Sequence, residues 1–145
     1  LLSKLGENLV AKGSGYFITK SSNSYQIILY NYAYFDELSR LKLGIQEKFS
    51  YKHTENKEFV LTLTEIPSGN YKIKKTYLNE NSGSIFDAWK KMGEPENIDD
   101  EVFELLQLKE KMDLYIEKKE ILNRYNILEK LSVQTVVFIE VEKYI

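Results

Sequence analysis

The feature that most constrains this chain is a run of large apolar residues over positions 25–32, Tyr-Gln-Ile-Ile-Leu-Tyr-Asn-Tyr. Side chains alternate between the two faces of a β-strand, so Ile27 and Leu29 would share one face, and Ile28 and Tyr30 the other. A strand that is apolar on both faces needs cover on both sides. We therefore predict a central strand of a β-sheet here.

Two turn signals predict hairpins in the first half of the chain. Residues 21–24, Ser-Ser-Asn-Ser, separate two β-rich runs within positions 15–32. Hydroxyl and amide side chains bond to their own backbone and favour a turn there. Residues 67–70, Pro-Ser-Gly-Asn, separate the alternating segments 59–64 and 71–77. Proline presets φ and the following residues tolerate positive φ, which predicts a second hairpin.

Helical spacing appears in three short segments. Residues 34–45 carry one such pattern, followed by a polar stretch over 46–58 that we expect to be an exposed loop. Ser84 and Asp99 are each placed to cap a short helix, and Gly93 can end the first of these two. We expect the apolar stripes of these helices to be buried; they comprise Ile85, Phe86, Trp89 and Met92, then Val102, Leu105 and Leu106.

Alternation returns in the C-terminal third, over residues 114–116, 125–131 and 137–141. The pattern predicts a mostly β fold: an antiparallel β-sandwich of about seven to eight strands, with two or three short helices in the connections. We expect residues 1–145 to form a single accessory domain excised from a larger protein. Residues 1–12 would be a linker or packing segment, whose leucines Leu1, Leu2 and Leu5 face a partner domain.

Composition excludes several classes of function. The 145 residues contain 20 basic and 22 acidic side chains, a net charge of −2, so no global field would attract this segment to nucleic acid. Cysteine is absent, which excludes disulfides and thiolate sites and fits a cytoplasmic protein. No apolar run approaches the roughly 20 residues of a membrane helix, so we expect no membrane contact.

The sequence supplies few groups for catalysis. The single histidine, His53, lies in the polar stretch without a glycine-flanked nucleophilic serine, and neither clustered metal ligands nor a phosphate-binding glycine loop occurs. Glu140 and Glu142 occupy the polar phase of a strand, which gives these acids a structural role. We therefore predict no catalytic residues, no metal and no cofactor. Tyr32 and Tyr34 are the candidate ligand-binding residues, since tyrosine rings can stack on sugars, although cross-strand packing explains them more simply.

Three segments in order carry a family resemblance: residues 25–32, residues 69–73 continuing to 83–95 (Gly-Ser-Ile-Phe-Asp-Ala-Trp-Lys-Lys-Met-Gly-Glu-Pro), and residues 136–141. They resemble the C-terminal β-sandwich of glycoside hydrolase family 39, the β-xylosidase and α-L-iduronidase group. A similar module occurs in large AraC-type bacterial transcription regulators. The resemblance implies a sandwich flanking a barrel that carries both catalytic glutamates, and the family's Asn-Glu-Pro motif is absent from this chain.

The resemblance leads to two hypotheses, and the candidate tyrosines named above lead to a third. The first is a non-catalytic accessory and interaction domain of an AraC-type regulator, with the parent protein's barrel as its partner and a homo-oligomer left open. It is favoured because the stretch before the Trp89 helix reads Leu78-Asn79 and Gly83-Ser84, which differs from the xylosidases. The second is the same domain in an active β-xylosidase. The third is a carbohydrate-binding module acting through Tyr32 or Tyr34.

Overall fold

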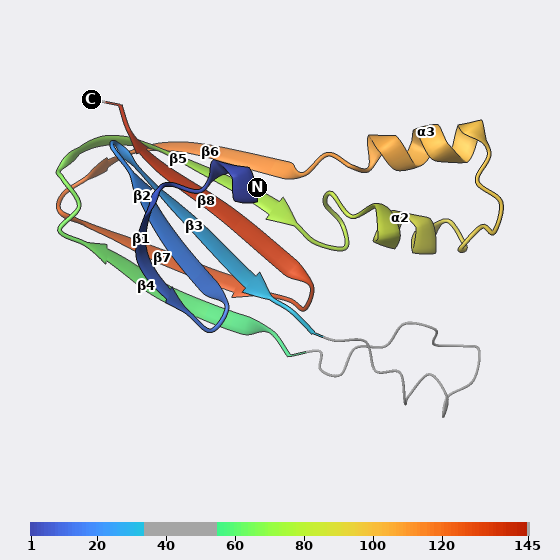
Figure 1. The fold of residues 1–145 in the computed structure, drawn as a ribbon, viewed down its shortest axis with the longest axis horizontal. Coiled ribbons are helices and arrows are strands. Elements are labelled where there is room, and N and C mark those ends of the chain that lie inside the picture. Colours follow the sequence, from blue (N-terminus) through green and yellow to red (C-terminus); the bar gives the residue numbers. More distant parts are fainter. Residues whose placement is uncertain (34–54, 145) are drawn as a thin grey trace.

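The computed structural model describes residues 1–33 and 55–144. In this part of the chain eight strands form two antiparallel sheets that pack face to face (Figure 1). The mostly β, sandwich-like class predicted from the alternation is confirmed. The predicted helix over residues 34–45, the loop residue His53 and the candidate Tyr34 lie outside the described residues.

The larger sheet has six strands in the order β1-β2-β3-β8-β5-β6, and the smaller sheet pairs β4 with β7. A short 3-10 turn, η1 (Leu2–Lys4), precedes the first strand. The strands are β1 (Asn8–Gly13), β2 (Tyr16–Ser21), β3 (Ser24–Asn31), β4 (Lys57–Thr64), β5 (Gly69–Leu78), β6 (Asp113–Ile121), β7 (Arg124–Leu131) and β8 (Thr135–Lys143).

Strand β3 lies in the interior of the larger sheet, as its double apolar face predicts. It pairs with β2 on one side, through the predicted hairpin at residues 21–24, and with β8 on the other. Ile27 and Leu29 are 0% exposed and face the smaller sheet. On the opposite face Ile28 is 7% exposed but Tyr30 is 41% exposed, so this second face is only partly covered.

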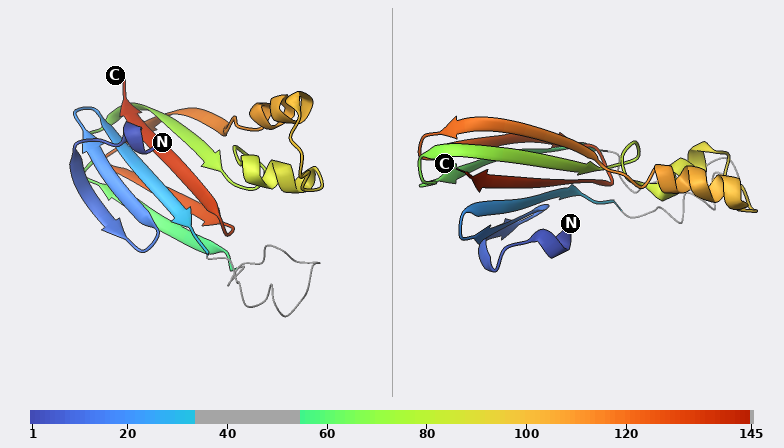
Figure 2. Two further views of the ribbon diagram at one scale, coloured as in Figure 1. Left: turned by 45° about the vertical axis from the view of Figure 1, so that its right-hand side comes forward. Right: turned by 90° about the horizontal axis from the view of Figure 1, so that it is seen from above.

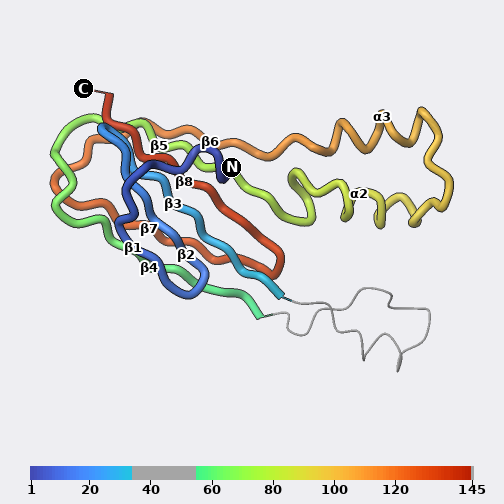
Figure 3. The backbone as a smooth tube through the Cα atoms, viewed as in Figure 1, coloured from blue at the N-terminus to red at the C-terminus, as the bar shows by residue number. Residues whose placement is uncertain are grey.

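The predicted hairpin at residues 67–70 is wrong. Strand β4 pairs with β7 in the smaller sheet, whereas β5 lies between β8 and β6 in the larger one. Figure 3 shows the chain crossing from one sheet to the other between β4 and β5. Glu65 takes a positive φ of 57° and Ile66, 1% exposed, enters the core at the crossing. The Tyr71 hydroxyl donates to the Pro67 carbonyl over 2.7 Å and holds the crossing in place.

The hydrophobic core fills the space between the sheets. Every second side chain of the strands in both sheets points into this space, so the core brings together strands that are far apart in sequence. Its central members, all at most 2% exposed, are Ile27, Leu29, Ile66, Tyr71, Ile73, Ile121, Ile127, Leu131, Val137, Ile139 and Val141.

Two helices, α2 (Ile85–Lys91) and α3 (Asp100–Leu108), connect β5 to β6. Both predicted caps are present: the Asp87 amide donates to Ser84 Oγ over 3.2 Å, and the Val102 amide to Asp99 Oδ1 over 2.9 Å. Gly93, with φ 90°, follows the end of α2. Neither helix of the described residues is long and apolar enough to span a membrane.

The prediction that both helices bury their apolar stripes is confirmed at Leu106 and wrong for the stripe of α2. No residue of α2 is buried, and Leu106 is the single buried residue of α3. The helices project from one end of the sandwich, so their apolar faces reach beyond the sheets that could cover them (Figure 2). Trp89 is half-buried, and its indole N–H donates to the Pro95 carbonyl over 3.0 Å within the same projection.

Replacing Ile139 with alanine should lower the free energy of unfolding by about 3 kcal/mol, because it leaves a cavity in the fully buried core. A urea titration followed by circular dichroism measures this change. Val60, 73% exposed on the smaller sheet, is the control, and Val60→Ala should alter the free energy by less than about 0.5 kcal/mol. Equal losses in the two variants would contradict a core between the sheets.

Candidate functional site

The outer face of the larger sheet, which points away from β4 and β7, carries an apolar groove. The groove has a volume of about 680 Å³. Strands β2, β3, β8 and β5 supply its floor, the N-terminal segment one wall, and the segment before β6 the other. Its apolar lining residues are Leu1, Leu2, Leu5, Phe17, Ile28, Tyr30, Leu78, Met112 and Val136. We call this surface the outer groove.

Hydrogen bonds fix the N-terminal wall of the outer groove. The Gly6 amide donates to Thr19 Oγ1 over 2.9 Å, and the Thr19 hydroxyl donates to Gln26 Oε1 over 3.0 Å. Thr19 and Gln26 are 3% and 5% exposed, so this polar chain lies beneath the N-terminal segment. A Cβ at Gly6 would lie 2.6 Å from the Lys20 backbone, so glycine permits the close approach. The segment before β1 is therefore part of the sandwich.

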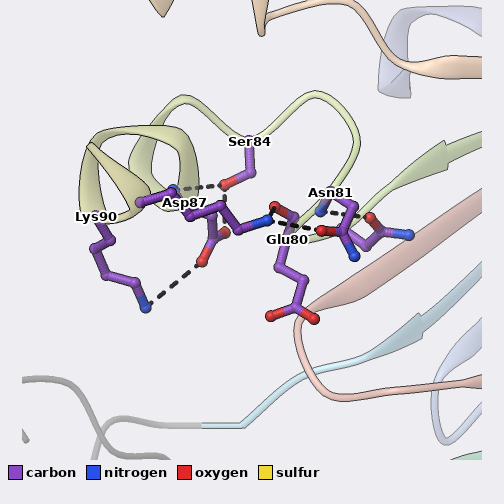
Figure 4. Close-up of polar contacts among 7 residues, drawn as sticks. Glu80, Asn81, Ser84, Asp87 and Lys90 are labelled. Carbon is purple, nitrogen blue, oxygen red and sulfur yellow. Dashed lines mark hydrogen bonds and ion pairs between the residues drawn. The ribbon is translucent and has the colours of Figure 1, made fainter. Parts of the chain in front are cut away.

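Polar contacts also anchor the projecting helices, which we call the helical arm (residues 84–109). Lys91 Nζ donates to the Glu80 carbonyl over 3.0 Å and to Asn81 Oδ1 over 2.7 Å (Figure 4). Ser82, 4% exposed, donates to the Tyr77 carbonyl over 2.8 Å and accepts from the Asp113 amide over 2.6 Å. The end of β5 and the start of β6 are thus joined at the base of the arm.

The helical arm exposes several large apolar side chains. Ile98, Phe103 and Leu108 are 54%, 55% and 68% exposed. Gly83 and Met112, at the base of the arm, also line the outer groove. Exposed apolar area of this extent on an amphipathic element is typical of an interaction surface.

A second, more polar groove of about 580 Å³ lies on the inner face of β5 and β6. Lys75 Nζ lies 2.7 Å from Glu129 Oε1, and the Tyr77 hydroxyl donates to the same carboxylate over 3.1 Å. Tyr115, 60% exposed, packs edge-on against Tyr77 with ring centroids 5.5 Å apart. Because Glu129 belongs to β7, this cluster links the two sheets.

The same cluster determines how Tyr77 titrates. Burial, and next the negative charge of Glu129, raise the pKa of Tyr77 above its ordinary value of 10.0. Burial also raises the pKa of Tyr125, with the carboxylates of Glu117 and Glu129 adding to the effect. The Glu129 carboxylate accepts from the Lys75 ammonium and the Tyr77 phenol, an arrangement that joins the two sheets.

The predicted ligand-binding residues are only partly described. Tyr32 is 57% exposed and lines an open groove beside the start of β4 with Glu55 and Lys57, while Tyr34 lies outside the described residues. Leu1, Leu2 and Leu5 line the outer groove together, and their contact with a partner domain stays a prediction. Sequence reasoning missed the exposure of the arm and the Glu129 cluster, because only the topology brings β7 beneath β5. Within residues 1–33 and 55–144, no group of three histidine, cysteine or acidic side chains is placed to hold a metal.

Replacing Tyr77 with phenylalanine should lower the free energy of unfolding by about 1 kcal/mol at neutral pH, through loss of the bond to Glu129. A raised pKa in the folded state means that the contribution of Tyr77 is complete below pH 10 and disappears as the pH rises through the folded-state value. The free energy of unfolding should therefore fall less steeply above pH 10 in Tyr77→Phe than in the unsubstituted chain. Urea titrations at several alkaline pH values measure this, with exposed Tyr32→Phe as the control; parallel curves for Tyr77→Phe and the parent would contradict the assignment.

Comparisons with known proteins address the fold and the sequence separately. No protein-family model matches the chain. Over 91 residues, 63% of this chain, it is 26% identical to an uncharacterized HTH-type transcriptional regulator of Staphylococcus aureus strain COL. The same similarity is found in strain N315. The chain spans 11% of the length of these regulators.

Solved structures share the fold over nearly the whole chain. A monomeric β-xylosidase from Caulobacter crescentus CB15 matches with a TM-score of 0.78 and 17% identity, covering 99% of this chain and 29% of that protein. A GH39 enzyme from Xanthomonas axonopodis pv. citri matches with a TM-score of 0.72 and 11% identity, again over 99% of this chain and 29% of the enzyme. This chain thus has the fold of a β-rich portion of glycoside hydrolase family 39 enzymes, and resembles in sequence a short part of an HTH-type regulator.

Proposed function

We propose that this chain is a non-catalytic accessory domain of an AraC-type transcription regulator, which packs through the outer groove against a barrel domain of the same protein. The observation that carries the proposal is the groove itself. It is apolar, it is bordered by an N-terminal segment that buried hydrogen bonds fix in place, and it lies beside an arm with exposed apolar side chains. Burial of such a surface against a second domain is favourable by about 25 cal/mol per Å² of apolar area.

The charged groups on the outer face suit a structural role. Glu140 lies 3.7 Å from Lys74, and Glu142 lies 3.2 Å from Lys72, as cross-strand ion pairs between β8 and β5. With Glu129 held by Lys75 and Tyr77, these strand carboxylates are matched by cations on the neighbouring strand or sheet. Glycoside hydrolysis needs one carboxylic acid and one carboxylate nucleophile or base that both face a sugar. The ion pairs of these strand carboxylates instead support a role in holding strands and sheets together.

The comparisons support a regulator as the parent protein. The sequence similarity is to an HTH-type regulator, and it spans 11% of that protein, as expected for one domain among several. The fold similarity to β-xylosidases covers 29% of those chains, which agrees with an accessory portion. The second candidate, an accessory domain of an active β-xylosidase, is favoured by the TM-score of 0.78 with the Caulobacter enzyme.

The two candidates predict different activities for the full-length protein that contains this chain. A regulator should bind DNA and leave a chromogenic xyloside intact, whereas a β-xylosidase should cleave the xyloside. In both cases the isolated chain should show no hydrolysis. Turnover by the isolated chain would contradict the non-catalytic assignment common to both.

Substitution of Tyr30 tests the outer groove directly. Tyr30→Asp places a charge in the apolar groove and should weaken binding of the chain to the separately produced remainder of its parent protein by about tenfold or more. Isothermal titration calorimetry measures the affinity. Val60→Asp is the matched control, because Val60 is exposed on the far side of the smaller sheet and should leave the affinity unchanged. Equal effects of the two substitutions, or no binding by the unsubstituted chain, would exclude the groove as the docking surface.

A further inference from the structure

Strand β6 forms one edge of the six-stranded sheet. Along one side β6 forms backbone pairs with β5 over nine consecutive residues without a bulge. No strand of the described residues pairs with its opposite side, which is the edge of the sheet. Eight of its nine residues are exposed, among them Leu114, Tyr115 and Ile116 at 49%, 60% and 59%. A long and regular edge strand presents unpaired backbone donors and acceptors that can pair with another strand.

The opposite edge of the sheet differs in this respect. Strand β1 has six residues, and its pairing with β2 is interrupted by an irregularity between Leu9 and Ala11. Short length, bulges and charged side chains are common means of preventing edge-to-edge association. Strand β6 lacks the first two, and its central charges have both signs, Glu117 beside Lys118 and Lys119, so they oppose pairing only with a strand of unmatched charge.

The side chains of β6 are complementary to a second β6 in antiparallel register. With Lys118 on the two-fold axis, Glu117 of each strand lies opposite Lys119 of the other, and both residues point to the inner face with Tyr115. Tyr115 then lies opposite Ile121, and Leu114 opposite Leu122. Opposite charges and aromatic–β-branched pairs in directly facing positions stabilise antiparallel pairing. The charge pair and the apolar pair each occur twice because of the symmetry.

Neighbouring registers are less complementary. A two-fold axis at Glu117 places two carboxylates opposite each other and Tyr115 opposite Lys119. An axis at Lys119 forms Lys118–Glu120 pairs on the outer face, but it places Glu117 opposite the buried Ile121 and Tyr115 opposite Asn123, which lies beyond the end of β6. The Lys118 register combines the Glu117–Lys119 pairs with the Tyr115–Ile121 and Leu114–Leu122 neighbours, at the cost of two exposed lysines at the axis and of Ile116 opposite Glu120.

We propose that β6 pairs with β6 of a second copy of this chain, in antiparallel register about Lys118, so that the two six-stranded sheets become one continuous sheet. The pairing leaves the outer groove of each copy accessible. Strand β6 begins at the base of the helical arm (Figure 1). The antiparallel arrangement therefore directs the two arms toward opposite ends of the dimer. The complementarity depends on these particular side chains, so it does not extend to proteins that share only the fold.

Exchanging the charges of Glu117 and Lys119 tests whether the partner of β6 is a second copy of this chain. Sedimentation equilibrium of the 145-residue chain should show a monomer–dimer equilibrium. Glu117→Lys and Lys119→Glu should each weaken the dimer by roughly tenfold, because each brings two like-charged pairs together. The double variant E117K/K119E should restore the dimer affinity of the unsubstituted chain. Lys12→Glu, on the β1 edge, changes the net charge equally and should have no effect. A monomer at all concentrations, or a double variant as weak as the single ones, would overturn the proposal.

A cross-link tests the register. The chain has no cysteine, so Lys118→Cys provides a single thiol. In the proposed register this thiol faces its own copy, with Cα atoms about 4.5–5.5 Å apart, within the range for a disulfide. Mild oxidation should convert Lys118→Cys to a covalent dimer more than tenfold faster than Lys119→Cys, the matched neighbouring lysine. Faster cross-linking through position 119 would overturn this register, and cross-linking at neither position would overturn the β6 pairing.

Discussion

The fold depends on the burial of the central strands β3 and β8 of the larger sheet, whose inner faces pack against the smaller sheet. Ile27 and Leu29 of β3 and Val137 and Ile139 of β8 are all 0% exposed. They are joined by an unbroken ladder between residues 24 and 142 at one end and 31 and 135 at the other. Because these strands are about 100 residues apart in sequence, the order of β2, β3, β8 and β5 depends on long-range apolar packing. The outer groove lies on the reverse side of the same strands.

Strand alternation and local capping could be read from the sequence. The double apolar phase of residues 25–32 predicted a strand between two neighbours, and Ser84 and Asp99 predicted the two helix starts. Each of these features depends on residues close together in the chain. The turn at residues 67–70 could not be interpreted in this way, because proline and glycine favour a reversal without specifying which sheet the next strand joins. Burial of Ile66 decides that the chain crosses the sandwich.

The helical arm shows why an amphipathic pattern does not determine burial. Ile85, Phe86 and Met92 have the spacing of a core-facing stripe, yet each is more than a third exposed. Periodicity predicts that these side chains share a face, and this is a property of the helix itself. Whether the face meets a sheet depends on where β5 ends and β6 begins, a junction fixed by Ser82 and Lys91. The same residues that contradict the predicted core therefore form a candidate interaction surface.

Strands β6 and β8 extend this argument to the sheet as a whole. Both are nine residues long, and both carry apolar side chains in each phase, as Tyr115 and Ile116 do in β6 and Val137 and Phe138 in β8. Phe138 is 0% exposed whereas Ile116 is 59% exposed, and among the described strands β8 has a neighbour on each side while β6 has a neighbour on one side. A sequence pattern reports the surface that a strand can bury, and the topology decides whether this chain buries it. Where the topology does not, as at the β6 edge, the outer groove and the helical arm, the remaining apolar area is available to other domains or copies.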